Sequence, residues 1–182
     1  RGVVLHHERA QVLGRAGYVS HQVGKWHQGL ESIACVPVSR GFASSLGYLG
    51  GAEDHADQTV DAVCNCTGPG TGCVDLWRDG TPARGENGTY SARMYTNEAI
   101  RIIAEHPKDK PLFLYQAWQN IHGPYEVPAK YRALFPPDAS CDVASGTKDC
   151  CGWTERSPAQ PYADPITPSR VPSMSASGKT IM

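Results

Sequence analysis

The segment Pro-Leu-Phe-Leu-Tyr-Gln-Ala-Trp at residues 111–118 constrains the fold more than any other part of the chain. It is almost continuously apolar, which is typical of a β-strand that is buried on both faces within a parallel sheet. A helical stripe of apolar residues precedes it, from about Ser91 to His106, and Pro107 ends this predicted helix. A helix that leads into such a strand indicates an α/β fold.

The N-terminal part of the chain repeats this order of helix and strand. A short helix is predicted from about His7 to Ala16, and the β-rich segment at residues 18–23 predicts a strand. Residues 28–91 are rich in loops and contain no long periodic element, and a further short helix is predicted at residues 128–134. We therefore expect part of a mixed, mostly parallel sheet that is flanked by helices.

The composition changes after residue 135. Half of the chain's 14 prolines fall in residues 136–182, among Ser, Thr and Ala. Such a segment has no visible core, so we expect residues 136–182 to form a Pro/Ser-rich irregular insertion or a disordered tail.

Charge and hydropathy exclude two classes of partner. The chain has 17 basic and 18 acidic side chains, so no broad attraction to nucleic acid is expected. No apolar run approaches the roughly 20 residues that span a bilayer, so no membrane span is expected.

Cysteines and glycosylation sequons indicate the compartment. Six of the seven cysteines gather in two polar loops: Cys64, Cys66 and Cys73 in the first, and Cys141, Cys150 and Cys151 in the second. This pattern favours disulfides over ordinary zinc spacings. The sequons make Asn65 and Asn87 candidate glycosylation sites. Together these features predict the secretory pathway, with a lysosomal or extracellular destination.

One disulfide can be predicted more closely. Cys73 is expected to pair with Cys64 or with Cys66, because the glycines between them let the chain turn back. We favour Cys64, since closure from Cys66 leaves less room for the turn. Such a loop would stabilise the oxidised protein by about 2–3 kcal/mol.

Three side chains that suit an anionic ligand follow the predicted strands. Lys25 and His27 come after the strand at residues 18–23, and His122 comes after the strand at residues 111–118. Open α/β sheets usually bind ligands at the carboxyl ends of their strands. Residues two apart along a strand share a face, so Lys25 and His27 are expected to project together. A lysine supplies positive charge for an oxyanion, and a histidine can bind it or carry a proton.

Several motifs occur in an order that resembles the sulfatase family. Gly24-Lys25-Trp26-His27-Gln28-Gly29 is similar to the family's Gly-Lys-Trp-His-Leu-Gly signature. Further matching segments follow in the family's order: Arg40-Gly41-Phe42, Gly50-Gly51-Ala52-Glu53-Asp54, Asp75-Leu76-Trp77-Arg78-Asp79-Gly80 and His122-Gly123-Pro124. The resemblance covers roughly residues 7–135 and is strongest to the arylsulfatase B (N-acetylgalactosamine-4-sulfatase) branch.

The resemblance implies a fold, an activity and a role for each candidate residue. The fold is alkaline-phosphatase-like, and residues 1–135 would form part of the N-terminal catalytic domain. The activity is hydrolysis of sulfate esters in a sulfated small molecule or, more specifically, a sulfated glycan. Lys25 would bind the sulfate oxygens, His27 would be the catalytic histidine, and His122 would lie near the sulfate and the leaving-group oxygen.

The resemblance also implies cofactors that this chain does not supply. Sulfatases use a formylglycine made from a Cys/Ser-x-Pro-x-Arg motif that precedes the lysine, and no cysteine precedes Lys25 here. The segment from Cys35 to Arg40 resembles that motif, but its arginine is one residue too far and it follows Lys25. The family's calcium ligands are also expected outside this chain, so no metal ligand is assigned. We therefore expect the chain alone to be inactive.

Two other interpretations stay open at this point. A secreted pseudoenzyme that binds sulfate or a glycan would also retain Lys25, His27 and His122. Another hydrolase of the alkaline-phosphatase superfamily would use Thr or Ser with two metals, but the chain lacks an Asp-x-x-x-His spacing for them.

Overall fold

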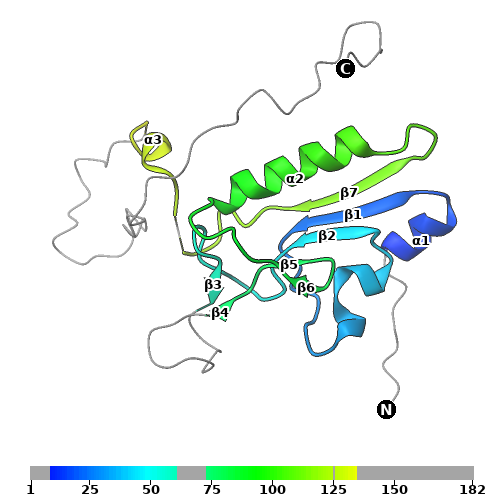
Figure 1. The fold of residues 1–182 in the computed structure, drawn as a ribbon, viewed down its shortest axis with the longest axis horizontal. Helices are drawn as coiled ribbons and strands as arrows, with labels where there is room; N and C mark the ends of the chain where they lie inside the picture. The colour runs from blue at the N-terminus through cyan, green and yellow to red at the C-terminus, as the bar shows by residue number, and fades with distance from the viewer. Residues whose placement is uncertain (1–8, 61–72, 125, 135–182) are drawn as a thin grey trace, which may run out of the picture.

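The computed structural model describes residues 9–60, 73–124 and 126–134 (Figure 1). The elements predicted from the sequence are all present: α1 (Arg9–Arg15), β1 (Val19–Gly24), α2 (Ser91–Glu105), β7 (Leu112–Ala117) and α3 (Ala129–Arg132). The predicted start of the first helix at His7 lies outside the described residues. The same holds for residues 136–182, so the expectation for that segment stays a prediction.

The main sheet has the strand order β6-β5-β2-β1-β7 (Figure 1). β1 pairs in parallel with β2 (Ser44–Gly47) on one side and with β7 on the other. β5 (Trp77–Arg78) and β6 (Thr81–Pro82) extend the sheet beyond β2 in antiparallel pairs. This arrangement confirms the predicted mixed sheet with a parallel core.

Short elements connect these strands. The 3-10 helices η1 (Ile33–Cys35) and η2 (Pro37–Arg40) lie between β1 and β2. β3 (Thr59–Val60) and β4 (Cys73–Val74) form a separate antiparallel pair. The sequence did not predict β2, because its Ser-Ser-Leu-Gly segment is four residues long and has a single large apolar side chain, Leu46. Its place between β1 and β5, rather than its own pattern, makes it a buried strand.

The expectation that residues 111–118 are buried on both faces is wrong for the described residues. The side chains of β7 are only partly buried, and Tyr115 is 38% exposed. Among the described residues, β7 pairs with β1 on one side and has no strand on the other. An edge position therefore accounts for the exposure of this apolar strand.

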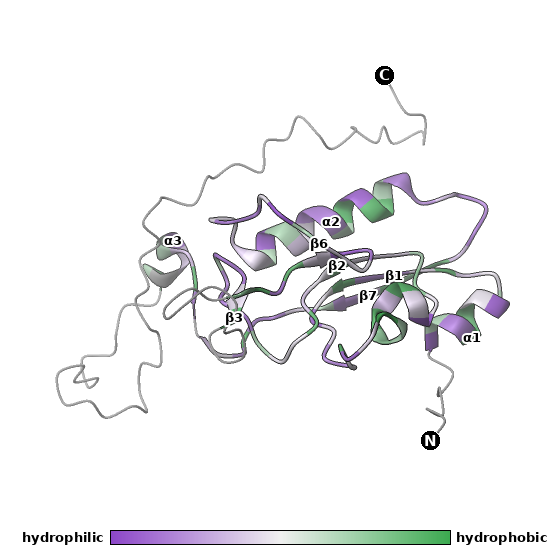
Figure 2. Ribbon diagram, turned by 60° about the horizontal axis from the view of Figure 1, so that its bottom comes forward, coloured by the Kyte–Doolittle hydropathy of each residue, from purple (hydrophilic) through white to green (hydrophobic). Residues whose placement is uncertain are grey.

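Two apolar clusters lie against the sheet, one with α2 and one with α1. The cluster with α2 contains Val23, Leu46, Tyr48, Leu76, Met94, Tyr95 and Ile102. The cluster with α1 contains Ala10, Trp26, Val36, Phe42 and Leu49. Figure 2 shows α2 and α1 on opposite sides of the strands. Helices thus cover both faces of the parallel core.

α2 is amphipathic and packs its apolar face against the sheet. Met94, Tyr95 and Ile102 are buried, whereas Ile103 is 54% exposed. Each fully buried apolar side chain of this size contributes about 1.5–3 kcal/mol, so packing stabilises the helix more than its propensity does. Within residues 9–60, 73–124 and 126–134, no helix is both long and apolar enough to cross a membrane.

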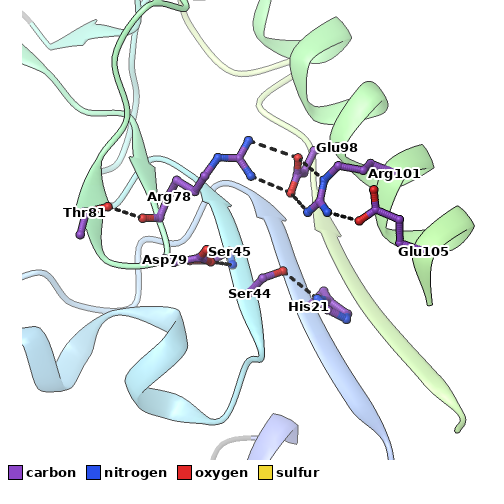
Figure 3. Close-up of polar contacts among 9 residues, drawn as sticks. All are labelled: His21, Ser44, Ser45, Arg78, Asp79, Thr81, Glu98, Arg101 and Glu105. Atoms are coloured by element: carbon purple, nitrogen blue, oxygen red, sulfur yellow. Dashed lines mark hydrogen bonds and ion pairs between the residues drawn. The ribbon is translucent and has the colours of Figure 1, made fainter. Parts of the chain in front are cut away.

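A polar network joins α2 to β5 (Figure 3). The buried carboxylate of Glu98 accepts hydrogen bonds from Arg78 at 2.9 and 3.2 Å and from Arg101 at 2.6 and 3.2 Å. Burial alone would raise the pKa of Glu98, but the hydrogen bonds from Arg101 and Arg78 outweigh it, and the pKa is lowered. Glu98 is therefore a fully paired anion that ties the helix to the sheet.

Candidate functional site

The parallel strands β1, β2 and β7 end at one edge of the sheet. Val23 is in register with Leu46 of β2, and Gly24 is in register with Ala117 of β7. Three loops leave from this edge, at residues 25–32, 48–58 and 118–124. Lys25, His27 and His122 thus follow strands that end at the same edge, which is the position expected from the sequence.

Two glycines allow the strands to approach closely at this edge. Gly24 has φ +96°, and a Cβ on it would lie 1.9 Å from the carbonyl oxygen of Ala117. A Cβ on Gly47 would lie 1.8 Å from the carbonyl oxygen of Gly24. Both contacts are far inside van der Waals distance, so these positions exclude any side chain. The close approach brings the backbone N–H of Lys25 within 2.8 Å of the Ala117 carbonyl oxygen.

The side chain of Lys25 reaches the loop that follows β2. Its Nζ donates a hydrogen bond of 2.6 Å to the carbonyl oxygen of Gly51. The ammonium group has three donors, so this bond fixes its position and leaves donors for an anion. Lys25 is partly buried, which strengthens the attraction of a charge for an oxyanion compared with bulk water.

His27 lies against the same glycine. A Cβ on Gly51 would lie 3.2 Å from Cε1 and 3.3 Å from Nε2 of the His27 ring. His27 adopts the left-handed conformation, with φ +47°, and its N–H donates to the carbonyl oxygen of Leu49 at 3.2 Å. Contact with Gly51, rather than alternation along a strand, therefore brings Lys25 and His27 together.

The loop that carries His122 is joined to the loop after β2. Gln119 is buried, accepts a hydrogen bond of 2.6 Å from the Ser91 hydroxyl, and donates to the carbonyl oxygen of Glu53. Nε2 of His55 lies 3.4 Å from the carbonyl oxygen of His122. The His122 side chain is exposed, and its Nδ1 lies 2.8 Å from the carbonyl oxygen of Gly123. The loop is anchored by its neighbours, while the imidazole stays accessible.

Glu53 is a buried carboxyl group close to this edge. Burial raises the pKa of Glu53 to about 9, against a hydrogen bond of 2.7 Å from the Tyr95 hydroxyl that lowers it. Glu53 is therefore protonated and uncharged near pH 7. A neutral carboxyl group two residues from Gly51 adds no negative charge that would repel an anion.

Sequence reasoning did not assign roles to Gly51 or Asp75. The carboxylate of Asp75 accepts hydrogen bonds from the backbone N–H groups of Leu49 and Gly50. Both residues lie in segments that match the family pattern, but those matches carry no information about which atoms touch. The contacts join residues about 25 positions apart, and periodicity does not report such pairs.

The structure does not supply a metal site within the residues that it describes. In these ranges no group of three or more His, Cys, Asp or Glu side chains could hold a metal ion. A cavity of about 440 Å³ is lined by residues that include Asp57, Cys73, Trp77 and Arg84, and it contains none of the three candidate site residues. The described residues therefore bring Lys25 and His27 together at Gly51 and contain no such metal cluster.

The predicted modification sites are only partly described. Asn87 is exposed in a loop, whereas Asn65 lies outside the described residues. Cys73 begins β4, but Cys64 and Cys66 also lie outside them. The disulfide and both glycosylation sites stay predictions.

The chain is similar to known proteins over most of its described length. A model of the sulfatase family matches residues 10–163. Arylsulfatase J of Mus musculus is 39% identical over 122 residues, which cover 66% of this chain and 20% of that protein. An arylsulfatase of Klebsiella aerogenes is 27% identical over 125 residues, which cover 66% of this chain and 25% of that protein. The chain spans a quarter or less of the length of these relatives.

Solved structures agree with this assignment. The crystal structure of Ps i-CgsB has a TM-score of 0.60 and 25% identity, and the match covers 73% of this chain and 30% of that one. The same protein in complex with k-i-k-neocarrahexaose has a TM-score of 0.58 and 25% identity, covering 70% and 29%. The family match, the relatives and the shared fold together show that the chain belongs to the sulfatase family.

Proposed function

We propose that the chain forms part of the sulfate-binding site of a sulfuric ester hydrolase within a longer polypeptide. The observation that carries the proposal is the meeting of Lys25 and His27 at Gly51, at the carboxyl edge of a parallel sheet. A positive charge and a titratable ring beside one another suit a sulfate ester, whose transition state carries negative charge on its oxygens.

Each residue has a separate role in this proposal. Lys25 binds the sulfate oxygens with the donors that Gly51 leaves available. His27, which is exposed beside it, accepts or donates a proton during turnover. His122 approaches from the loop after β7 and acts near the leaving-group oxygen, so the three side chains converge on one bound sulfate.

The nucleophile and the metal belong to other parts of the protein in this proposal. The formylglycine would supply the attack on sulfur, and a calcium ion would polarise the sulfate. The described residues contain no cluster that fits calcium, and Cys35 follows Lys25 rather than preceding it. This chain therefore contributes charge, orientation and proton transfer.

We further propose a sulfated glycan as the substrate and the arylsulfatase B branch as the subfamily. The motif order supports the branch, and the structure of Ps i-CgsB in complex with k-i-k-neocarrahexaose supports a carbohydrate ligand. The cysteine clusters and sequons support a secreted or lysosomal glycoprotein. Peptide mapping without reduction would test the Cys64–Cys73 disulfide, and a linked Cys66–Cys73 peptide would contradict it.

The central test is hydrolysis of p-nitrophenyl sulfate by the full-length protein. Lys25→Ala should lower kcat/KM by about 10²–10³-fold, because preorganised charge at such a site stabilises the transition state by several kcal/mol. Lys108→Ala removes an exposed lysine before β7 and should leave the rate unchanged.

The isolated 182-residue chain provides the second arm of the test. It should show no turnover, because no Cys/Ser-x-Pro-x-Arg motif precedes Lys25 in its sequence and its described residues contain no cluster that fits calcium. Turnover by the isolated chain that disappears in Lys25→Ala would overturn the proposal and make Cys35 the first candidate nucleophile. Sulfate binding without turnover by the full-length protein would instead indicate a pseudoenzyme.

A further inference from the structure

The carboxylate of Asp75 organises the loop that holds Lys25 and His27. Oδ2 accepts a hydrogen bond of 2.7 Å from the N–H of Gly50, and Oδ1 accepts one of 3.2 Å from the N–H of Leu49. The indole N–H of Trp77 donates to Oδ1 at 2.8 Å and fixes the orientation of the carboxylate. Asp75 itself is held by its own N–H, which donates to the carbonyl oxygen of Gln58 at 2.9 Å.

These contacts suit the two acceptor oxygens of an aspartate at position 75. A carboxylate has two oxygens and only accepts hydrogen bonds, so it can receive all three N–H groups at once. An asparagine would present an NH₂ group to at least one of these N–H donors. The contact is also close, since a Cβ on Gly50 would lie 2.8 Å from Oδ2 of Asp75.

We propose that Asp75 is a positioning residue of the sulfate site, an inference that rests on the function proposed above. It fixes the N–H groups of residues 49 and 50, and thereby the next residue, Gly51. The carbonyl oxygen of Gly51 holds the Lys25 ammonium, and its Cα side lies against the His27 ring. Asp75 acts through this loop and does not touch the substrate.

Asp79 offers a matched control, because it follows β5 as Asp75 precedes it and also accepts a hydrogen bond from the backbone of β2. Its Oδ1 accepts a hydrogen bond of 2.6 Å from the N–H of Ser45, at the start of β2 rather than at its end (Figure 3). Asp79 has φ +51°, a conformation that asparagine tolerates better than most residues. Asp79→Asn thus perturbs the same kind of contact at the other end of β2.

The first experiment compares the two variants in the full-length protein with p-nitrophenyl sulfate. Asp75→Asn should lower kcat/KM by about 10–100-fold, the usual effect of losing a group that orients a reacting side chain. Asp79→Asn should stay within about threefold of the wild type at temperatures below unfolding. Equal losses in both variants, or no loss in Asp75→Asn, would overturn the proposal.

A mutant cycle separates positioning from simple stabilisation. If Asp75 acts through the loop that holds Lys25 and His27, adding Asp75→Asn to a variant that carries both Lys25→Ala and His27→Ala should change kcat/KM by less than about threefold. The same 10–100-fold loss in this background as in the wild type would show that Asp75 acts independently of both side chains and would overturn the proposal.

Binding of inorganic sulfate keeps the two proposals distinguishable. If the full-length protein is not a hydrolase, the function proposed above fails, but sulfate should still raise the melting temperature of the wild type and of Asp79→Asn. Asp75→Asn should lose this shift. An unchanged shift in Asp75→Asn would overturn the role of Asp75 whatever the outcome for catalysis.

Discussion

Buried polar groups beneath α2 and at the carboxyl edge of the same sheet differ in how many hydrogen bonds they make. Beneath α2, both carboxylate oxygens of Glu98 receive hydrogen bonds from arginines. At the edge, Oε2 of Glu53 and Nδ1 of His55 are buried without a hydrogen-bond partner among the described residues. The Glu98 carboxylate is therefore fully paired, whereas these two atoms of the loop after β2 are not.

Unpaired buried polar atoms need an explanation, because they oppose folding. A buried polar atom without a partner destabilises a fold by about 1–3 kcal/mol, so it persists where another requirement outweighs stability. Among the described residues, such atoms occur in the loop after β2, at Glu53 and His55, but also in β1, in β7 and at the end of α2, at Ser20, Gln116 and His106. We expect changes beneath α2 to act on stability, and changes in the loop after β2 to act also on activity, because that loop contacts Lys25.

The largest effect is expected from the apolar contact of α2. Ile102→Ala should lower the free energy of unfolding of the full-length protein by about 2–5 kcal/mol, because it leaves a cavity in the core. Ile103→Ala is the matched control, since Ile103 is the next residue of α2 and is 54% exposed. Denaturant unfolding measures both, and equal losses would contradict the packing described here.

The buried carboxyl group of Glu53 should make the stability of the protein depend on pH. Burial raises the pKa of Glu53 to about 9, so the folded state keeps a proton that the unfolded state loses at lower pH. Stability should therefore fall as pH rises from about 5 to 9, by an amount on the order of a few kcal/mol. Glu53→Gln should remove this decline and be more stable than the wild type at pH 8.

The exposed Glu31 provides the control for this measurement. Glu31→Gln should leave the decline unchanged in thermal or denaturant unfolding from pH 5 to 9. A wild type whose stability is the same as that of Glu53→Gln across this range would show that Glu53 is ionised in the folded protein.

The smallest effect is expected from the ion pairs of Glu98. Its pKa is lowered in the folded state, so its contribution is present above the ordinary carboxyl pKa and is lost as pH falls below it. Glu98→Gln should destabilise the protein by about 1–2 kcal/mol near pH 7, because Arg78 and Arg101 are 43% and 44% exposed and solvent screens the pairs. The difference should shrink toward pH 3.

Glu105→Gln tests whether the effect is specific to the buried carboxylate. The Glu105 side chain is 62% exposed and pairs with the same Arg101. This variant should change stability by less than about 0.5 kcal/mol. A loss as large as that of Glu98→Gln would contradict the distinction between the buried and the exposed pair.

The sequence was sufficient where a pattern extends over many residues. The stripe of α2 and the apolar run of β7 are long enough to define their elements. β2 was not predicted, because four residues with one large apolar side chain are too few to show an alternating pattern. The edge position of β7 was not predicted either, since the sequence of a strand does not show how many strands pair with it.

The sequence predicted which edge of the sheet carries the candidate site residues, but it did not predict the atoms that contact them. The positions of Lys25, His27 and His122 after strands placed them at one edge, because parallel strands share their direction. The partners that hold Lys25 and His27 were not predictable. Gly51 contacts Lys25 through its backbone carbonyl oxygen, which every residue has. Asp75 contacts the loop through its carboxylate, which every aspartate has, so only the folded structure shows that these atoms are in contact.

The acceptor that holds Lys25 is a main-chain oxygen, and this has a consequence for interpreting natural variants. No codon change can delete that oxygen, so position 51 will not appear as a ligand in any comparison of side chains. Damage to the contact would instead come from replacements that reroute the chain nearby, such as Gly51→Ala, whose new methyl group would press on the His27 ring. A variant at this glycine would then disturb the contacts of both Lys25 and His27, although the codons of both residues are intact.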